Sequence, residues 1–318
     1  MSGVAAPAFA PNVVARTLHR LSLVDAGGLD HLSAASSLVR IDQHLYVAAD
    51  DEHHLGAFDL TDAGSGRLVR LFDGDLPRRH KDRKAAKPDL EALLQLPASA
   101  SCPHGALLAL GSGSRPQRRR GVLLALDADG ALSGAPRPVD LQPLYAALAL
   151  HFDKPNIEGA FVTGAAFCLL HRGAAGSANA CVRFEWSAVA RWLEAGGPAP
   201  TALSVQSYEL GMIDGVPLAF TDAAALPDGG WVFCAAAEDT DNAYDDGGSK
   251  GSAIGTVDPQ GRLAWIALLE PVCKVEGIAL STTGANMEVL LVSDADDRES
   301  PALLLCASLP EAALPSAA

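Results

Sequence analysis

The sequence of 318 residues predicts an all-β protein, a five-bladed β-propeller of four-stranded antiparallel blades that is closed by the N-terminal strand. Three observations lead to this fold class. A polar residue recurs about every 60 residues at the start of an apolar run. Each recurrence is followed by short β-rich runs bounded by Gly, Asp, Asn or Pro. The chain also begins with one strand-like run to spare and ends one such run short.

The recurring polar position stands at Ser33, Glu91, Glu158, Asp222 and Glu276. It opens the first strand of each unit, as in "KPDLEALL" and "KPNIEGAF". Five blades that start near these residues are therefore expected, within one domain that spans residues 1–318. A sixth blade would need a further stretch of roughly 40–60 residues, and no such stretch is left unassigned.

The strands of each unit follow in chain order. Three runs per unit have the length and composition of meander strands: "SSLVRI", "HLYVAAD" and "HLGAFDL"; "EALLQLP", "HGALLALGSGS" and "GVLLALD"; "GAFVTG", "AAFCLLHRG" and "NACVRFEW"; "AAALPDG", "GWVFCAAAEDTD" and "SAIGTVD"; and "GIALSTTG", "MEVLLVSDADD" and "PALLLCASL". Outer strands are supplied by "RLVRLFDG", "TALSVQSYEL" and "RLAWIALLE".

The fifth unit ends after its third run, at Leu309, and lacks an outer strand. The run "NVVARTLHRLSLV" near the N-terminus precedes the first unit and belongs to none. Residues 12–24 are therefore expected to complete the last blade, which would join both ends of the chain and leave no exposed inner edge.

One short helix is expected in the third unit. The stretch "EWSAVARWLEAGG" (185–197) places Val189, Trp192 and Leu193 at helical spacing, and Gly196 and Gly197 end it.

Composition and charge exclude several classes of protein. A formal net charge of −14 argues against a nucleic-acid partner. No apolar run approaches the roughly 20 residues that span a bilayer, and the N-terminus shows no signal-peptide pattern. The six cysteines occur singly, mostly within apolar runs, which is typical of buried reduced thiols in a cytoplasmic protein.

The recurring position predicts a metal site. The first strand of each propeller blade lines the axis, so Ser33, Glu91, Glu158, Asp222 and Glu276 would meet in one narrow channel. Four carboxylates there would repel one another unless protonated, paired with lysines or bound to a cation. Oxygen ligands in an irregular shell suit Ca²⁺ better than Mg²⁺, so calcium is the expected cofactor.

Around the ring, the residues Ser33, Glu91, Glu158, Asp222 and Glu276 give the order hydroxyl, Glu, Glu, shorter polar residue and Glu. This order resembles that of the soluble calcium-activated nucleotidases, or apyrases. This resemblance implies a five-bladed propeller with Ca²⁺ on its axis. The "E-G-[IA]" strand starts are also similar to the phytase-like and esterase-like propellers of bacteria, most of which have six blades. One departure concerns Asp222, which stands where the nucleotidase pattern has a hydroxyl residue.

Basic residues are expected at the same mouth as the ring. Lys87 and Lys154 stand four residues before a ring carboxylate and Lys274 two residues before one, while Arg172 and Arg298 lie in loops after the second strands. With the metal they would bind a small anionic molecule. The sequence thus favours a phosphate ester or anhydride hydrolase, with Glu158 or His53 taking the proton.

Two alternatives stay open. In a lactonase or esterase-like propeller the same metal would activate water against a carbonyl, and in a binding propeller the ion would be structural. A basic rim around the ring would favour the phosphate ester or anhydride hydrolase. An apolar pocket above the ring would favour the lactonase or esterase, and a mouth plugged by side chains would favour the binding propeller. The sequence leaves the oligomeric state open.

Overall fold

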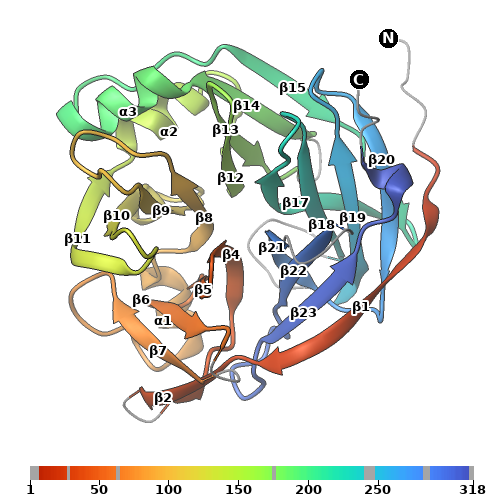
Figure 1. The fold of residues 1–318 in the computed structure, drawn as a ribbon, viewed down its shortest axis with the longest axis horizontal. Coiled ribbons are helices and arrows are strands. Elements are labelled where there is room, and N and C mark those ends of the chain that lie inside the picture. Colours follow the sequence, from red (N-terminus) through yellow and green to blue (C-terminus); the bar gives the residue numbers. More distant parts are fainter. Residues whose placement is uncertain are drawn as a thin grey trace.

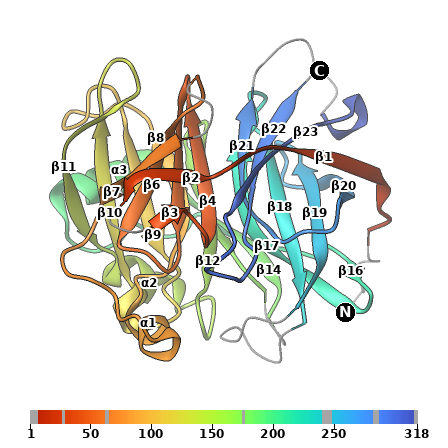
Figure 2. The same ribbon diagram turned by 90° about the horizontal axis from the view of Figure 1, so that it is seen from below.

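The β-sheets stand around a common axis in a propeller-like arrangement (Figure 1). The computed structural model describes residues 7–26, 29–61, 65–173, 177–239, 248–281 and 287–314. The acidic stretch "DTDNAYDD", residues 239–246, lies outside these residues except for Asp239. Seen from the side, the strands run roughly along the axis and the N-terminal strand crosses the outside of the molecule (Figure 2).

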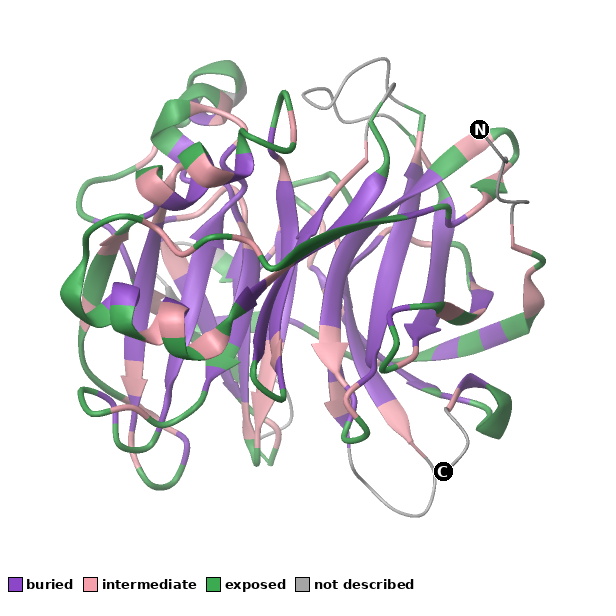
Figure 3. Ribbon diagram, turned by 90° about the horizontal axis from the view of Figure 1, so that it is seen from above, coloured by how far each residue is buried: buried purple, intermediate pink, exposed green. Residues whose placement is uncertain are grey.

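In the part of the chain that the structure describes, five innermost strands surround the axis: β4 (Ala35–Ile41), β8 (Leu90–Leu96), β12 (Ile157–Thr163), β17 (Val216–Ala225) and β21 (Val275–Ser281). Each contacts the next one in the chain, and β21 contacts β4, so the contacts form a closed ring. These strands read as apolar runs because both of their faces are covered, and they are mostly buried (Figure 3).

Each innermost strand starts an antiparallel meander that moves outward. The second strands are β5 (His44–Ala49), β9 (Ala106–Gly111), β13 (Ala166–His171), β18 (Trp231–Glu238) and β22 (Glu288–Ser293). The third strands are β6 (His54–Asp59), β10 (Arg120–Leu126), β14 (Asn179–Glu185), β19 (Ser249–Val257) and β23 (Leu303–Ser308). Outer strands are β7 (Ser65–Arg70), β11 (Leu132–Asp140), β15 (Ser204–Tyr208) and β20 (Leu263–Glu270).

The N-terminal strand β1 (Ala10–Arg20) pairs with two sheets. Its C-terminal half, from Ala15, is antiparallel to β23, whereas its first residues are parallel to β20. Two of the expected four-stranded sheets are therefore joined into one of nine strands, with β16 (Met212–Ile213) at its edge. The strand is long enough, at 11 residues, to reach past the outer edge of one sheet to the next.

The expected closing segment, residues 12–24, spans a break. Leu21 is buried and donates its N–H to the carbonyl of Ala302, which ends β1. After it, β2 (Ser22–Ala26) pairs with β7, and with β3 (Leu29–His31) it extends the first meander to six strands.

The expected helix is confirmed as α3 (Trp186–Ala195), with Val189, Trp192 and Leu193 buried. Gly196 and Gly197 follow it with φ of 70° and 92°, a region that favours glycine. Two helices were not predicted, α1 (His80–Ala86) and α2 (Gln142–Leu148). Within the described residues, no helix has the length and apolarity to cross a membrane. All six cysteines are unpaired thiols, and five are buried as predicted.

Candidate metal centre at the mouth of the strand ring

Each innermost strand carries one β-bulge, at the second residue of four strands and in the middle of β17. The pairing with the second strand skips one residue there: Ser36, Glu91, Glu158, Thr221 and Glu276. A bulge bends the strand and re-aims the side chain of the extra residue. The recurring polar position of the sequence is therefore, in three of the five strands, the bulged residue.

The register differs from the expected one at two positions. Ser33 lies three residues before the bulge of its strand, and Ser36 occupies the bulge instead. Asp222 lies one residue after its bulge, which is occupied by Thr221. A bulge shifts the side-chain alternation by one residue, and aligning the sequence on its most polar residue does not reveal that shift.

Asp222 is buried within the ring, away from its mouth, with an exposed fraction of 1%. Its carboxylate accepts hydrogen bonds from the Ser37 hydroxyl at 2.8 Å, the Ala223 N–H at 2.8 Å and the Ile278 N–H at 3.2 Å. Burial raises its pKa well above the usual range, although these donors oppose the shift. Asp222 thus ties β17 to β4 and β21.

The two bulged hydroxyl residues anchor neighbouring glutamates. The Ser36 hydroxyl donates to the carbonyl of Leu90 at 2.5 Å, and the Thr221 hydroxyl donates to that of Val275 at 2.9 Å. Each accepting carbonyl belongs to the residue directly before a bulged glutamate of the next strand. The two hydroxyls therefore help to fix the backbone at Glu91 and Glu276.

A cavity of about 830 Å³ opens over the bulges. Its lining includes Ser36, the three bulged glutamates and the residues two positions before the bulges: Ala34, Asp89, Asn156, Ala219 and Lys274. Carboxylates outnumber bases in this lining, eight to five: Asp50, Asp89, Glu91, Glu158, Glu209, Glu238, Glu276 and Asp294 against Lys84, Lys87, Arg118, Arg172 and Lys274.

Ion pairs engage three of the basic side chains in the lining. The Lys87 ammonium lies between Asp50 and Asp89, at 3.0 Å from Asp89 Oδ1. Arg118 donates to Asp89 at 2.6 Å. Arg172 spans Glu158 at 3.3 Å and Glu238 at 3.0 Å. These bases thus neutralise carboxylates of the cavity and do not offer free positive charge.

Lys274 is surrounded by acids. Its Nζ lies 3.2 Å from Glu276, 3.2 Å from Glu238, 3.6 Å from Asp294 and 2.8 Å from Asp296. Burial alone would lower its pKa, but Glu276 and Glu238 outweigh that effect and hold the pKa well above the usual value. Lys274 therefore stays charged and acts as an internal cation.

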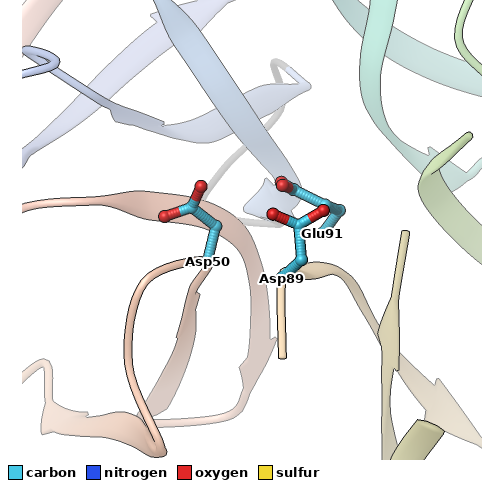
Figure 4. A group of neighbouring side chains, drawn as sticks. All are labelled: Asp50, Asp89 and Glu91. Carbon is cyan, nitrogen blue, oxygen red and sulfur yellow. The ribbon is translucent and has the colours of Figure 1, made fainter. Parts of the chain in front are cut away.

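Glu91 is the exception among the bulged glutamates. Within the described part of the chain it forms no ion pair or hydrogen bond, while its carboxylate, Asp50 and Asp89 offer oxygens that all lie within 4.8 Å of one another (Figure 4). Burial raises the pKa of Glu91 well above the usual range, and Glu158 and Asp89 raise it further. Converging carboxylate oxygens of this kind are ligands for a hard divalent cation.

Glu158 is held in place by two donors. Asn156 Nδ2 donates to its Oε1 at 2.6 Å, and Arg172 donates to its Oε2 at 3.3 Å. Burial raises its pKa, and Arg172 partly opposes the rise. The Asn156 N–H in turn donates to Nδ1 of His171 at 3.1 Å.

Five of the predicted site residues lie outside the cavity lining: the expected metal ligands Ser33 and Asp222, and Lys154, His53 and Arg298. Lys154 is exposed, and Asn156 takes the place beside the glutamate. His53 is buried beside Phe72 with Nδ1 3.1 Å from the Gly74 carbonyl, and burial lowers its pKa. Arg298 pairs with Asp51 and Glu52 at 3.4 and 3.6 Å.

Sequence reasoning missed several lining residues. Asp50 and Asp294 directly follow the second strands β5 and β22, as Arg172 follows β13. The signal was available, since in these three sheets the residue directly after the second strand returns to the mouth where the innermost strand begins. Asp89, with φ of 56°, stands two residues before its bulge.

An apolar flank covers one side of the cavity. It is formed by residues of the N-terminal segment and of the chain around β16: Pro7, Phe9, Tyr208, Leu210, Met212, Pro217 and Leu218. The Phe9 ring lies against Gly211, where an added Cβ would stand 3.1 Å from Phe9 Cζ. The cavity is thus acidic on the axis and apolar at one edge.

Comparisons with known proteins give fold-level likenesses and one family. The structure is similar to a glutaminyl cyclase from Myxococcus xanthus at 10% identity and TM-score 0.49, covering 95% of this chain and 100% of that one. It is similar to a hypothetical protein from Leishmania major at 12% identity and TM-score 0.47, covering 93% and 91%. Likenesses this distant transfer no function.

No curated protein sequence matches the chain. A family model does match, over residues 31–309, which is most of the sequence and all five innermost strands. The chain belongs to that family, DUF6929, a family of unknown function.

Proposed function

We propose that the protein is a five-bladed β-propeller that binds one divalent cation, Ca²⁺, at the mouth of its axis and hydrolyses a small ester or lactone there. The observation that carries the proposal is Glu91, a carboxylate that faces Asp50, Asp89 and Glu158 without a bonded base. A cation at this point would offset the repulsion between Glu91 and these acids, which Lys87 opposes only in part and without a bond to Glu91.

The blade count rests on the closed ring of five innermost strands and on the pairing of β1 with β23. In this interpretation β1 is the outer strand of the fifth blade, and its extension along β20 ties the fourth and fifth blades together. Closure by the N-terminal strand would leave the ring without an inner edge.

The residues fit calcium. Asp50, Asp89 and Glu91 would hold the ion, because their carboxylate oxygens lie within 4.8 Å of one another, and Glu158 and Glu276 line the same cavity. The residues at the bulges are, in chain order, Ser36, Glu91, Glu158, Thr221 and Glu276. The fourth position is therefore the hydroxyl residue Thr221 and not Asp222, as in the pattern of the calcium-activated nucleotidases. Irregular carboxylate sets are more compatible with Ca²⁺ than with octahedral Mg²⁺.

When bound, the cation would supply Lewis-acid polarisation of a substrate oxygen. The chain supplies the proton acceptor, which we assign to Glu158. Its orientation is fixed by Asn156 and Arg172, and its raised pKa suits proton transfer closer to neutral pH.

The cavity favours an uncharged carbonyl group over a phosphate. Carboxylates exceed bases in the lining, and Arg172 or Lys274 would have to leave an ion pair to bind a phosphate. The apolar flank offers a surface for the rest of an ester or lactone. The open volume of about 830 Å³ also argues against a plugged binding scaffold.

Phosphate ester hydrolysis is a second candidate. It is favoured by the order of hydroxyl and glutamate residues at the bulges, which resembles that of the calcium-activated nucleotidases. A screen of aryl esters, lactones, aryl phosphates, nucleotides and phytate, each with Ca²⁺ and with EDTA, separates the two. We expect calcium-dependent turnover of esters or lactones that Glu158→Gln reduces by roughly 100-fold or more. Turnover of phosphates alone would select the second candidate, and no turnover at all would contradict catalysis.

A further inference from the structure

The charge of the cavity indicates which substrates it accepts. Eight carboxylates and five bases line it, and the ion pairs of Lys87, Arg118, Arg172 and Lys274 are all made with acids. With all eight carboxylates ionised, one divalent cation would offset two of the three excess negative charges. The occupied site would therefore still be negative.

One lining carboxylate stands apart from the axis. Glu209 is exposed and lies between Tyr208 and Leu210 on the apolar flank. Among the described residues it makes no ion pair or hydrogen bond, in contrast to the paired acids Asp89, Glu158 and Glu238. It is a negative group without a counter-ion inside the same cavity.

The surroundings of Glu209 suit an organic cation with an apolar body. The half-buried Phe9 ring, which lies against Gly211 two residues beyond Glu209, lines the same cavity, as do Leu210 and Leu218. A carboxylate and an aromatic ring that line one cavity suit an ammonium group, the first by charge and the second by cation–π attraction. Metal ions are not favoured there, because a single carboxylate offers too few ligands.

We infer that the cavity selects a positively charged substrate, an ester or lactone that bears an ammonium group, and that Glu209 binds this group on the Phe9 flank. The inference rests on the proposed function for the ester or lactone part. Glu209 is then a specificity residue, remote from the metal ligands and from the proton acceptor.

The test measures binding of three aromatic probes of similar size by calorimetry, to the full chain with saturating Ca²⁺. The probes are phenyltrimethylammonium, benzyl alcohol and benzenesulfonate. We expect the cation to bind at least about tenfold more tightly than either of the others. Glu209→Gln should remove most of this preference, while Glu194→Gln, the same change on exposed α3, should leave it intact.

Two results would overturn the inference: benzenesulfonate binding as tightly as the cation, or a preference that Glu209→Gln leaves unchanged. The calcium-induced shift in melting temperature is recorded on the same samples. Glu209-dependent cation binding without a calcium shift would support the inference and count against the proposed metal. A calcium-induced rise in melting temperature without a preference for phenyltrimethylammonium would support the proposed metal and count against the inference.

Discussion

At the scale of single residues, the site depends on which carboxylates have partners. Glu158 and Glu276 are each bonded to a base, whereas Glu91 faces other acids. The sequence predicted these three glutamates because a carboxylate at the start of an apolar run is unusual. It could not predict that other acids share the same bases: Asp50 pairs with Lys87, Glu238 with Arg172 and Asp294 with Lys274, and these acids lie at the ends of second strands.

Glu91→Gln should stabilise the cation-free protein. The amide removes one charge from a set of repelling carboxylates, and relief of a pKa shift of one unit corresponds to about 1.4 kcal/mol. We expect the free energy of unfolding in EDTA, measured by urea denaturation, to rise by about 1 kcal/mol. A loss of stability would show that Glu91 is paired in solution.

The buried His171 ring predicts a loss of stability at acidic pH. Burial lowers its pKa to about 4, and the neutral ring accepts the Asn156 N–H and stacks on Phe152. Because the folded pKa lies below the ordinary value of 6.5, the stability contributed by neutral His171 is present above pH 6.5 and is lost as the pH falls toward 4.

The full effect is about 3 kcal/mol, at 1.36 kcal/mol per pKa unit. We expect the stability difference between wild type and His171→Gln to shrink by this order between pH 7 and pH 4, measured by urea denaturation. His19→Gln, a change at an exposed histidine, should show no such trend. A constant difference for His171 would mean that it is charged in the folded state.

At the scale of elements, the strand runs and the helix α3 were predictable because their periodicity is local. The bulges were not, because a bulge is defined by its pairing with a second strand. Aligning the units on their most polar residue therefore placed Ser33 and Asp222 in the ring, where pairing places Ser36 and Thr221. Helices α1 and α2 lacked the length that reveals an amphipathic pattern.

Asp222 tests the assembly of the innermost strands. Asp222→Ala leaves the Ser37 hydroxyl and the Ile278 N–H without their acceptor. Loss of a buried, multiply bonded carboxyl costs about 3 kcal/mol, which we expect in urea denaturation. Asp228→Ala, at a turn, should cost below about 1 kcal/mol. Equal effects would contradict a linking role for Asp222.

At the scale of the whole molecule, β1 joins the ends of the chain. Removing the first 25 residues should lower the melting temperature of the entire domain, because β23 and β20 would each lose a partner strand.

Two point variants test the same strand without removing it. Val13→Asp buries a charge at a site 6% exposed and should cost roughly 3 kcal/mol or more. Val14→Asp, at 68% exposed, should change stability by about 0.5 kcal/mol or less.

Equal melting of the truncated and full chains, or equal effects of the two valine variants, would contradict closure by β1. The spare N-terminal strand was predictable by counting runs. Its division between two sheets was not, since the sequence around Leu21 shows no turn signal.

The proposed calcium site is tested by calcium titration of the chelator-treated full chain, followed by calorimetry and by melting temperature. We expect one bound ion per chain and a stabilisation that approaches about 2.7 kcal/mol at 100 times the dissociation constant. Glu91→Gln should weaken binding by at least tenfold, whereas Glu194→Gln should not. A wild-type protein that neither binds Ca²⁺ nor gains stability from it would contradict the account.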